Sequence, residues 1–307
     1  MKIGIIVLNW NQRDYTVECL KSVNALKKDL HTIKVYLIDN ASEECDPNVF
    51  EELFPEVKLI ANENNLGFTG GNNIGISLAI KEDCDALLLL NNDTTVCSDL
   101  LNKLVQTLIS EKNIGIVVPK ILLLKQKNVI QYAGGKTNLY FGSYTHIGYG
   151  EHDDGQYNHV KVTEFCTGTA MLLKTDMIKE IGLLNDDFFL YAEDAEYSCR
   201  AKAFGYKLYY NGCAYIYHDE SPSLGGYLNP KSFYMSKRNS FYLVAIHGTF
   251  LQKIVFFTYS LTYFMLGVFM YSLVKQKNLS LFFTYIKSFI AFLKKEKGKP
   301  NYFDKKL

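Results

Sequence analysis

The chain has 307 residues, 48% of them hydrophobic, so it can bury a substantial core and is not a disordered protein. Its 33 lysine and arginine residues nearly balance 32 aspartate and glutamate residues, which gives no reason to expect nucleic-acid binding. The seven cysteines lack C-x-x-C spacing, which argues against a disulfide framework or a structural zinc site and favours a reducing cytosol.

Short apolar runs recur between helical patterns over residues 1–120. Continuous apolar runs are typical of parallel strands that are covered on both faces. The predicted strands are 3–10, 34–40, 57–63, 86–93 and 114–121, and the predicted helices are 14–27, 72–81 and 98–111. This alternation predicts an α/β fold with a doubly wound, mostly parallel sheet. The first run leads into polar residues without a small-residue cleavage site, so a buried strand is expected there rather than a signal peptide.

Three of the predicted strands end in polar side chains. The ends read Asn9-Trp10-Asn11, Asp39-Asn40 and Asn91-Asn92-Asp93. Ligands of open α/β sheets bind beyond the carboxyl ends of the strands. Asn and Asp also begin ordinary turns, and any one of these ends alone is better explained that way. Three such ends on one edge favour a ligand site.

The stretch "NLGFTGGNNIGI" at 65–76 is unusually rich in glycine. Glycines let a backbone approach a ligand closely, and a helix that follows offers free N–H groups to an anion. The stretch is neither a P-loop nor a G-x-G-x-x-G motif after the first strand. From this stretch alone a tight turn with an Asn cap on a helix near 73–81 is favoured, and a loop over 65–73 that holds a phosphate-bearing ligand is the alternative.

Residues 122–165 are rich in glycine and tyrosine and predict loops and short antiparallel strands. After a strand near 166–174, a helix is expected to be capped by Thr175 or Asp176 and closed by Gly182. Three carboxylates, Glu193, Asp194 and Glu196, then begin another helix, where they complement the helix dipole or supply a general base.

The segment 254–274 is twenty-one residues without a charge, about 31 Å as a helix and long enough to cross a bilayer core. The next segment is amphipathic and ends in lysines, as in helices that lie on anionic lipid. A single crossing would place these lysines outside, against the positive-inside bias. A shallow hairpin at the membrane interface is therefore expected, with packing on the catalytic domain or a dimer interface as the alternative.

The ordered set of motifs over residues 1–245 resembles family 2 glycosyltransferases with a GT-A fold, in particular the rhamnosyltransferase-like branch of bacterial cell-surface polysaccharide synthesis. The motifs that carry the resemblance are "IVLNWNQ", "LIDNAS", "NENNLGFTGGNNIGI", "LLLNNDT", "CTGTAMLLKTDMIKEIGLLNDDFFLYAEDAEYSCRAKAFGYKLYY", "AYIYHDES" and "KSFYMSKRNSFYL". Each is weak alone, and their order carries the inference.

The resemblance implies a catalytic domain over 1–245, with a nucleotide-sugar half at about 1–120 and an acceptor half at about 121–245. Residues 246–307 are then an appendage of hydrophobic and amphipathic helices, which form a membrane interface or a dimer.

Carried over by position, the resemblance implies that Asn9 and Trp10 border the nucleotide pocket. Asp39, which can only accept hydrogen bonds, is implied to bind the N3–H of uracil or thymine. The loop 65–73 is implied to close around the nucleotide. Its implied donor contacts are Asn65, Gly67, Gly71 and Asn72.

Asn92 and Asp93 stand at the family's D-x-D signature, the first near the ribose and the second on Mg²⁺ or Mn²⁺. Because the pattern here is N-N-D, the metal is expected to depend more on His218, the second candidate ligand. A lone histidine there is more often a turn residue, unless Asp93 is its neighbour.

Asp194 matches the general base of the family's E-D-x-D motif, and Glu193 is expected to help electrostatically. The last position of that motif is Glu196 here, which leaves its role open. Arg238 and Asn239 match the family's R-N pair, in which the arginine could brace the leaving diphosphate.

The implied reaction is an inverting, metal-dependent sugar transfer from a nucleotide-diphosphate donor to a hydroxyl of a lipid-linked or other glycan. dTDP-rhamnose is the first expectation and UDP-hexoses the second. The implied location is the cytoplasm, peripheral on the inner face of the bacterial plasma membrane. The reaction requires Asp39, Asp93 and Asp194 to converge on one cleft.

Two other classes stay open. A sugar nucleotidyltransferase could use a similar sheet, but such enzymes usually carry a basic Gly-rich loop after the first strand, where this chain has "NWNQRD". A non-catalytic partner in polysaccharide assembly could also have kept the fold, and a donor-hydrolysis assay would distinguish it.

Overall fold

The computed structural model describes residues 1–27, 30–44, 46–219 and 228–300. It contains two compact units. The first, here the sheet unit, comprises Met1–Lys136, Thr145–Leu184 and Tyr197–Glu220. The second, here the helical unit, comprises Thr137–Tyr144, Asn185–Glu196 and Ser221–Leu307. The predicted domain boundary at residue 245 stays a prediction.

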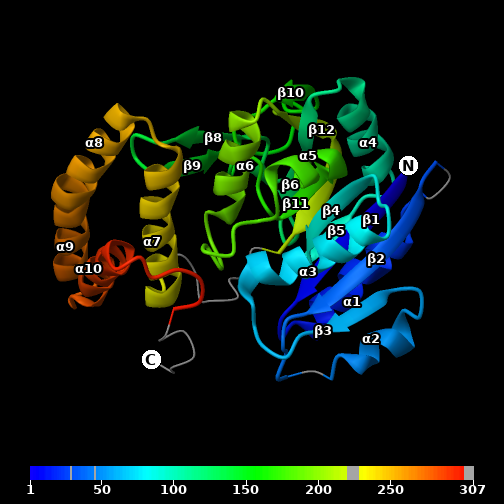
Figure 1. Ribbon diagram of the computed structural model, residues 1–307, viewed down its shortest axis with the longest axis horizontal. Helices are drawn as coiled ribbons and strands as arrows, with labels where there is room; N and C mark the ends of the chain where they lie inside the picture. The colour runs from blue at the N-terminus through cyan, green and yellow to red at the C-terminus, as the bar shows by residue number, and fades with distance from the viewer. Residues whose placement is uncertain (28–29, 45, 220–227, 301–307) are drawn as a thin grey trace. The chain divides into compact units, whose positions relative to one another are not determined.

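Within the described residues, a ten-stranded mixed sheet forms the first unit, in the order β10-β12-β6-β11-β4-β1-β2-β3, with β5 beside β12 and β7 beside β6 (Figure 1). The strands are β1 (Lys2–Asn9), β2 (Thr32–Asp39), β3 (Lys58–Ala61), β4 (Ala86–Asn91), β5 (Thr94–Val96), β6 (Ile114–Leu123), β7 (Ile130–Tyr132), β10 (Val160–Val162), β11 (Ala170–Lys174) and β12 (Lys207–His218). Strand β1 pairs in parallel with β2 and with β4, and β2 pairs in parallel with β3. Strands β6 and β12 are also parallel.

Helices flank this sheet, so the predicted α/β fold is confirmed. They are α1 (Arg13–Asn24), α2 (Asn48–Leu53), α3 (Gly67–Lys81), α4 (Leu100–Ser110), α5 (Thr175–Ile181) and the later turns of α6 (Glu193–Ala203). Apolar side chains of β1 and β4 are almost wholly buried, as expected for strands covered on both faces. The predicted short strands of the middle region include β8 (Gly135–Asn138) and β9 (Ser143–His146), which pair with each other.

The glycine-rich stretch is helical, which corrects the expected loop over 65–73. Helix α3 begins at Gly67, and it lies against β1. A Cβ atom on Gly71 would stand 2.4 Å from Cδ1 of Leu8, and one on Gly75 would stand 2.5 Å from Cγ2 of Ile6. These two glycines therefore let the helix approach the strand closely, and their role is packing.

The start of helix α5 also differs from the prediction. Its N-cap is Lys174, and Thr175 is the first helical residue. The Thr175 hydroxyl donates to the carbonyl of Cys84 at 2.7 Å, a tertiary contact that no local capping rule anticipates. Gly182 does end the helix, with a left-handed φ of 85°.

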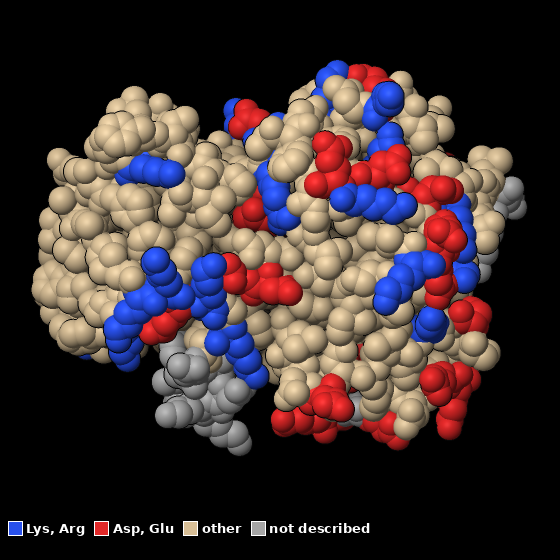
Figure 2. Space-filling model, in the orientation of Figure 1, with Lys and Arg blue, Asp and Glu red and all other residues tan. Residues whose placement is uncertain are grey.

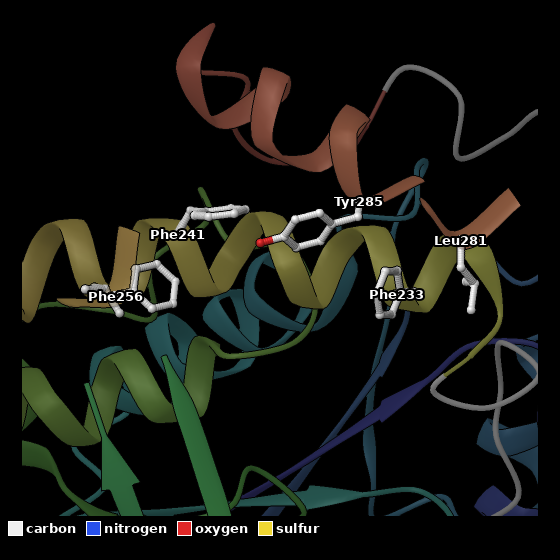
Figure 3. Close-up of a cluster of buried hydrophobic side chains, with 6 residues drawn as sticks. Phe233, Phe241, Phe256, Leu281 and Tyr285 are labelled. Atoms are coloured by element: carbon white, nitrogen blue, oxygen red, sulfur yellow. The ribbon is translucent and has the colours of Figure 1, made fainter. Parts of the chain in front are cut away.

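The helical unit contains α7 (Pro230–His247), α8 (Phe250–Tyr259), a π-helical turn at Ser260–Phe264, α9 (Met265–Val274) and α10 (Ser280–Leu293). Its core lies between α7, α8 and α10, where aromatic side chains converge (Figure 3). The ring centre of Phe241 is 5.6 Å from Phe256 and 6.0 Å from Tyr285. Aromatic pairs at such distances contribute attraction beyond the burial of their area.

The predicted apolar segment 254–274 lies inside one helical stretch, Phe250–Val274. Among the described residues, this is the one helix long and apolar enough to cross a membrane, and only 11% of its most apolar window is buried. An apolar helix with so little cover presents a broad hydrophobic surface.

Candidate functional site

A hydrogen-bonded network joins the ends of β1 and β2 in the sheet unit. Asn9 and Asp39 are direct neighbours in the parallel register, and Nδ2 of Asn9 donates to Oδ1 of Asp39 at 2.7 Å. The same carboxylate accepts from the backbone N–H and the hydroxyl of Ser42, at 3.0 and 2.7 Å. Asn9 and Asp39 are almost fully buried. The network fixes the Asp39 carboxylate, which keeps unused lone pairs for a further donor.

The network continues to the end of β4. Nδ2 of Asn92 donates to the hydroxyl of Thr16 at 2.8 Å and to Oδ1 of Asn9 at 3.3 Å. That Asn9 oxygen also accepts from Thr16 at 2.8 Å. Asn92 therefore connects the Asp39 side of the edge to the adjacent residue, Asp93. The predicted gathering of strand ends is present for Asn9, Asp39 and Asn92.

A second set of amides shapes the turn before α3. Nδ2 of Asn40 donates to Oδ1 of Asn65 and to the carbonyl of Gly67, both at 3.0 Å. Oδ1 of Asn65 also accepts from the N–H of Gly67 at 2.8 Å. Within α3, Nδ2 of Asn72 donates to the carbonyl of Phe68. The side chains of Asn65 and Asn72 thus make contacts within the protein, and their predicted contacts with the donor stay predictions.

Asp93 and His218 are neighbours, as a metal role for His218 requires. Nε2 of His218 lies 3.1 Å from Oδ1 of Asp93, and both side chains are mostly buried. Nδ1 of His218 is 2.8 Å from Oε1 of Gln131. Because an amide oxygen can only accept, Nδ1 carries the proton in this contact, and in the neutral ring Nε2 presents its lone pair to Asp93.

That arrangement fits a divalent cation. Oδ1 of Asp93 is buried without a hydrogen-bond partner, which is costly for a carboxylate oxygen. A histidine whose other ring nitrogen donates to a second oxygen acceptor is the usual form of a metal-ligating histidine. Among the described residues no cluster of three or more His, Cys, Asp or Glu side chains forms. The cation would therefore take most of its ligands from a bound molecule and water.

In the helical unit, Glu193 and Asp194 begin α6. Burial raises the pKa of Glu193 well above its usual value of 4.5, and the Asp194 charge adds to the effect. Oε2 of Glu193 is buried without a hydrogen-bond partner. The predicted electrostatic help from Glu193 stays a prediction. Asp194 is partly exposed, and its Oδ1 accepts from the N–H of Ala195 at 2.8 Å.

Glu196, whose role the sequence left open, pairs with a histidine. Oε1 of Glu196 lies 3.0 Å from Nε2 of His247, and the two side chains are 3% and 12% exposed. His247 is in the last turn of α7. Glu196 thus connects α6 to α7 within the helical unit.

Arg238 and Asn239 are completely buried and hold residues 187–191. The Arg238 guanidinium donates to Oδ1 of Asn239, to the carbonyl of Gly298 at 2.8 Å, and to the carbonyls of residues 187 and 188. These contacts bind the guanidinium within the protein. The predicted contact between Arg238 and the diphosphate stays a prediction.

The segment that this pair holds is strained. Phe189, Tyr191 and Ala192 all have left-handed φ values, between 61° and 71°, a region that non-glycine residues seldom adopt. Nδ2 of Asn239 donates to the carbonyls of residues 188, 190 and 191, at 2.7 to 2.9 Å. The strained segment leads directly into Glu193 and Asp194.

Asp39 and Asp93 belong to the sheet unit, whereas Asp194 belongs to the helical unit. The predicted convergence of Asp194 with the other two acids stays a prediction. Trp10 follows β1 at the network's edge and is partly exposed.

Several residues that hold the site were not identified as site residues from the sequence. They are Thr16, Asn40, Ser42, Gln131, Asn239 and His247. The motif "LIDNAS" contains two of them, Asn40 and Ser42, and the "RN" pair contains Asn239. Gln131 and His247 carry no local signal, because their partners are 87 and 51 residues away.

Comparison with known families and proteins gives one consistent result. The family model described as glycosyl transferase family 2 matches residues 4–182. The low-salt glycan biosynthesis hexosyltransferase Agl10 of Haloferax volcanii is 27% identical over 148 residues, which are 48% of this chain and 47% of that protein. The match thus spans about half the length of this curated relative.

Solved structures share the fold at low identity. The S. aureus TarS 1–349 structure in complex with UDP-GlcNAc has a TM-score of 0.59 and 17% identity, and the match covers 96% of this chain and 82% of that one. The structure of GalNAc-T7 with UDP, GalNAc and Mn²⁺ also has a TM-score of 0.59 and 17% identity, with 71% and 43% covered.

Proposed function

Because the chain belongs to glycosyl transferase family 2, we propose that it transfers a sugar from a nucleotide-diphosphate donor to a hydroxyl group of a glycan. The observation that carries this proposal is the network of side chains at the carboxyl ends of β1, β2 and β4 in the sheet unit. There the buried Asp39 carboxylate and the Asp93–His218 pair are connected through Asn9 and Asn92.

Asp39 would read the base of the donor. Its carboxylate is already oriented by Asn9 and Ser42, so little reorganisation is needed to accept from the N3–H of a pyrimidine. Purine bases that lack a ring N–H at this position would be disfavoured. Trp10, partly exposed beside this carboxylate's network, would border the nucleotide.

Asp93 and His218 would hold Mg²⁺ or Mn²⁺. When bound, such an ion neutralises negative charge on the departing diphosphate. Gln131 keeps the His218 ring oriented so that Nε2 faces Asp93. The Mn²⁺ in the GalNAc-T7 structure supports the same class of ion here.

Asp194 would act as the general base in an inverting displacement. It removes the proton from the acceptor hydroxyl as that oxygen forms its bond to the anomeric carbon and the bond to the diphosphate breaks. Its partial exposure suits a group that must reach an acceptor. Burial raises the pKa of the neighbouring Glu193 well above its usual value, which would lessen like-charge repulsion on Asp194.

The resemblance to rhamnosyltransferases favours dTDP-rhamnose as donor. The UDP-GlcNAc in the TarS complex favours a UDP-hexose as the second candidate. The acceptor we propose is a lipid-linked glycan at the inner face of the plasma membrane, because the little-covered apolar helix Phe250–Val274 could rest on lipid. The catalytic domain would span 1–245 and the appended helices 246–307.

A thermal-shift panel tests the donor proposal. UDP-, dTDP- and GDP-sugars are each added with and without Mn²⁺, because a ligand that binds only the folded state raises the melting temperature. We expect a metal-dependent shift with a pyrimidine nucleotide sugar. The shift should disappear in Asp93→Ala, whereas Asp194→Asn should keep it and lose turnover by about 10²–10⁴-fold. A GDP-sugar that shifts more than both pyrimidine donors would contradict the role of Asp39.

A further inference from the structure

The sheet unit contains a pocket of about 450 Å³ formed by β6, β12 and the segment 127–158. Its lining includes Lys120, Lys127, Asp153, Asn158, Tyr215 and Tyr217. Tyr215 and Tyr217 alternate along β12 with Ile216 and His218, and successive side chains of a strand point to opposite faces. The pocket therefore opens on the other face of β12 from the Asp93–His218 pair.

Two tyrosines form an aromatic wall in this pocket. The rings of Tyr215 and Tyr217 are 5.7 Å apart at an interplanar angle of 76°. Both side chains are partly exposed although they sit on a central strand. Nζ of Lys127 lies 5.4 Å from the centre of the Tyr217 ring. The wall thus offers apolar ring surface beside hydrogen-bonding groups.

The polar side of the pocket contains a buried lysine side chain. Lys120 is 4% exposed on its side chain, and its Nζ lies 2.6 Å from Oδ2 of Asp153 and donates to Oδ1 of Asn158 at 2.6 Å. The 16% exposed Asp153 keeps acceptor positions, and Nζ of Lys120 keeps one N–H. A buried ion pair adds little stability compared with apolar groups of the same size. Stability alone therefore does not account for this cluster.

We propose that this pocket binds a neutral pyranose ring of a glycan. A pyranose has an apolar C–H face that packs on aromatic rings, and hydroxyl groups that both donate and accept hydrogen bonds. Asp153 neutralises Lys120, and Lys127 lies over the Tyr217 ring, so the described lining does not gather several unpaired cations for a phosphate or a uronic acid. The site lies outside the proposed donor site. That the pocket binds a pyranose does not depend on the proposed function. That this pyranose belongs to the acceptor or product glycan does rest on it.

Saturation-transfer NMR on the full chain tests this site without nucleotide or metal. The probes are free rhamnose, glucose, galactose and N-acetylglucosamine and their commercially available short oligomers. We expect at least one neutral sugar to bind, and Tyr215→Ala with Tyr217→Ala to weaken its binding about tenfold or more. The control Tyr149→Ala, at an exposed tyrosine outside the pocket, should bind as the parent does. Asp93→Ala should also keep the sugar, since it alters the donor site alone.

Two results would overturn the proposal: no probe binds the parent chain, or binding survives the double tyrosine variant and is lost in Asp93→Ala. If the double variant does not melt cooperatively, the exposed Asn158→Ala replaces it, with several-fold weaker binding expected and unchanged binding counting against the site. Because no donor is present, failure here is separate from failure in the nucleotide-sugar panel.

Discussion

Three backbone carbonyls of residues 188–191 converge on the side-chain amide of Asn239, which has only two N–H groups to share among them. These bonds offset the cost of the left-handed residues Phe189 and Tyr191 in the same segment and of Ala192 just after it. Together with Arg238, this buried side chain holds the path of the chain into Asp194. No sequence pattern indicates this, because the partners are about fifty positions away.

Replacing Asn239 with Leu should lower the free energy of unfolding by about 2 kcal/mol or more, because several buried carbonyls lose their donor. Chemical denaturation of the full chain measures this. Ser240→Ala is the matched control, since the adjacent, similarly buried Ser240 bonds only one carbonyl within its own helix. If both variants lose the same stability, the segment does not depend on Asn239.

Because the pKa of Glu193 is raised, we expect the stability of the protein to depend on pH. Its pKa is raised in the folded state, so above about pH 4.5 the unfolded chain loses this proton while the folded chain keeps it. The contribution of Glu193 to the free energy of unfolding therefore falls as pH rises through the folded pKa.

Glu193→Gln should remove that fall, so the variant should gain stability over the parent as pH rises between about 5 and 8. Thermal melts across this range measure the difference. The exposed Glu63→Gln serves as control and should follow the parent. A parent and variant that differ by the same amount at every pH would show that Glu193 is ionised in the folded chain.

At the scale of elements, helix α3 and strand β1 show why the glycine-rich stretch forms a packed helix and not the predicted loop. Periodicity and glycine content are compatible with both a ligand loop and a closely packed helix. The choice depends on what faces Gly71 and Gly75, and that is Leu8 and Ile6 of β1. A contact between distant segments decides it.

Gly75→Ala should destabilise the protein by about 1–3 kcal/mol, because the added methyl group overpacks Ile6. Gly267→Ala is the matched control. It lies in helix α9, where an added Cβ would meet no atom within 4 Å, so the change should be neutral or stabilising by up to about 1 kcal/mol. Denaturant midpoints measure both. A stabilising Gly75→Ala would remove the packing explanation.

At the scale of the whole molecule, the net charge is +1, but the charged residues are unevenly distributed along the chain. Residues 250–300 contain eight lysines and one glutamate, so the rest of the chain is negative overall. Figure 2 shows a broad uncharged surface over the helices, with basic side chains gathered along one border of it. Apolar surface bordered by lysines suits anionic lipid.

Flotation with vesicles tests that association. The full chain should float with vesicles containing anionic lipid and float less with purely zwitterionic ones. Leu266→Glu with Leu273→Glu, both at exposed positions of α9, should reduce flotation about tenfold or more. Val160→Glu with Val162→Glu is the control on the exposed faces of β10. Equal loss in the two variants would contradict the assignment of lipid contact to the helical unit.

The order of strands and helices, the α/β class and the polar strand ends followed from the sequence, because period, burial pattern and turn residues are local properties. The family resemblance followed from motif order, and it identified Asp39, Asp93 and His218 as candidates. Only the tertiary structure decided three roles. Gly71 packs against β1, Arg238 is buried and binds backbone carbonyls, and Gln131 is the partner of His218. Each depends on a side chain or carbonyl tens of residues away, and such partners become neighbours only when the chain is folded.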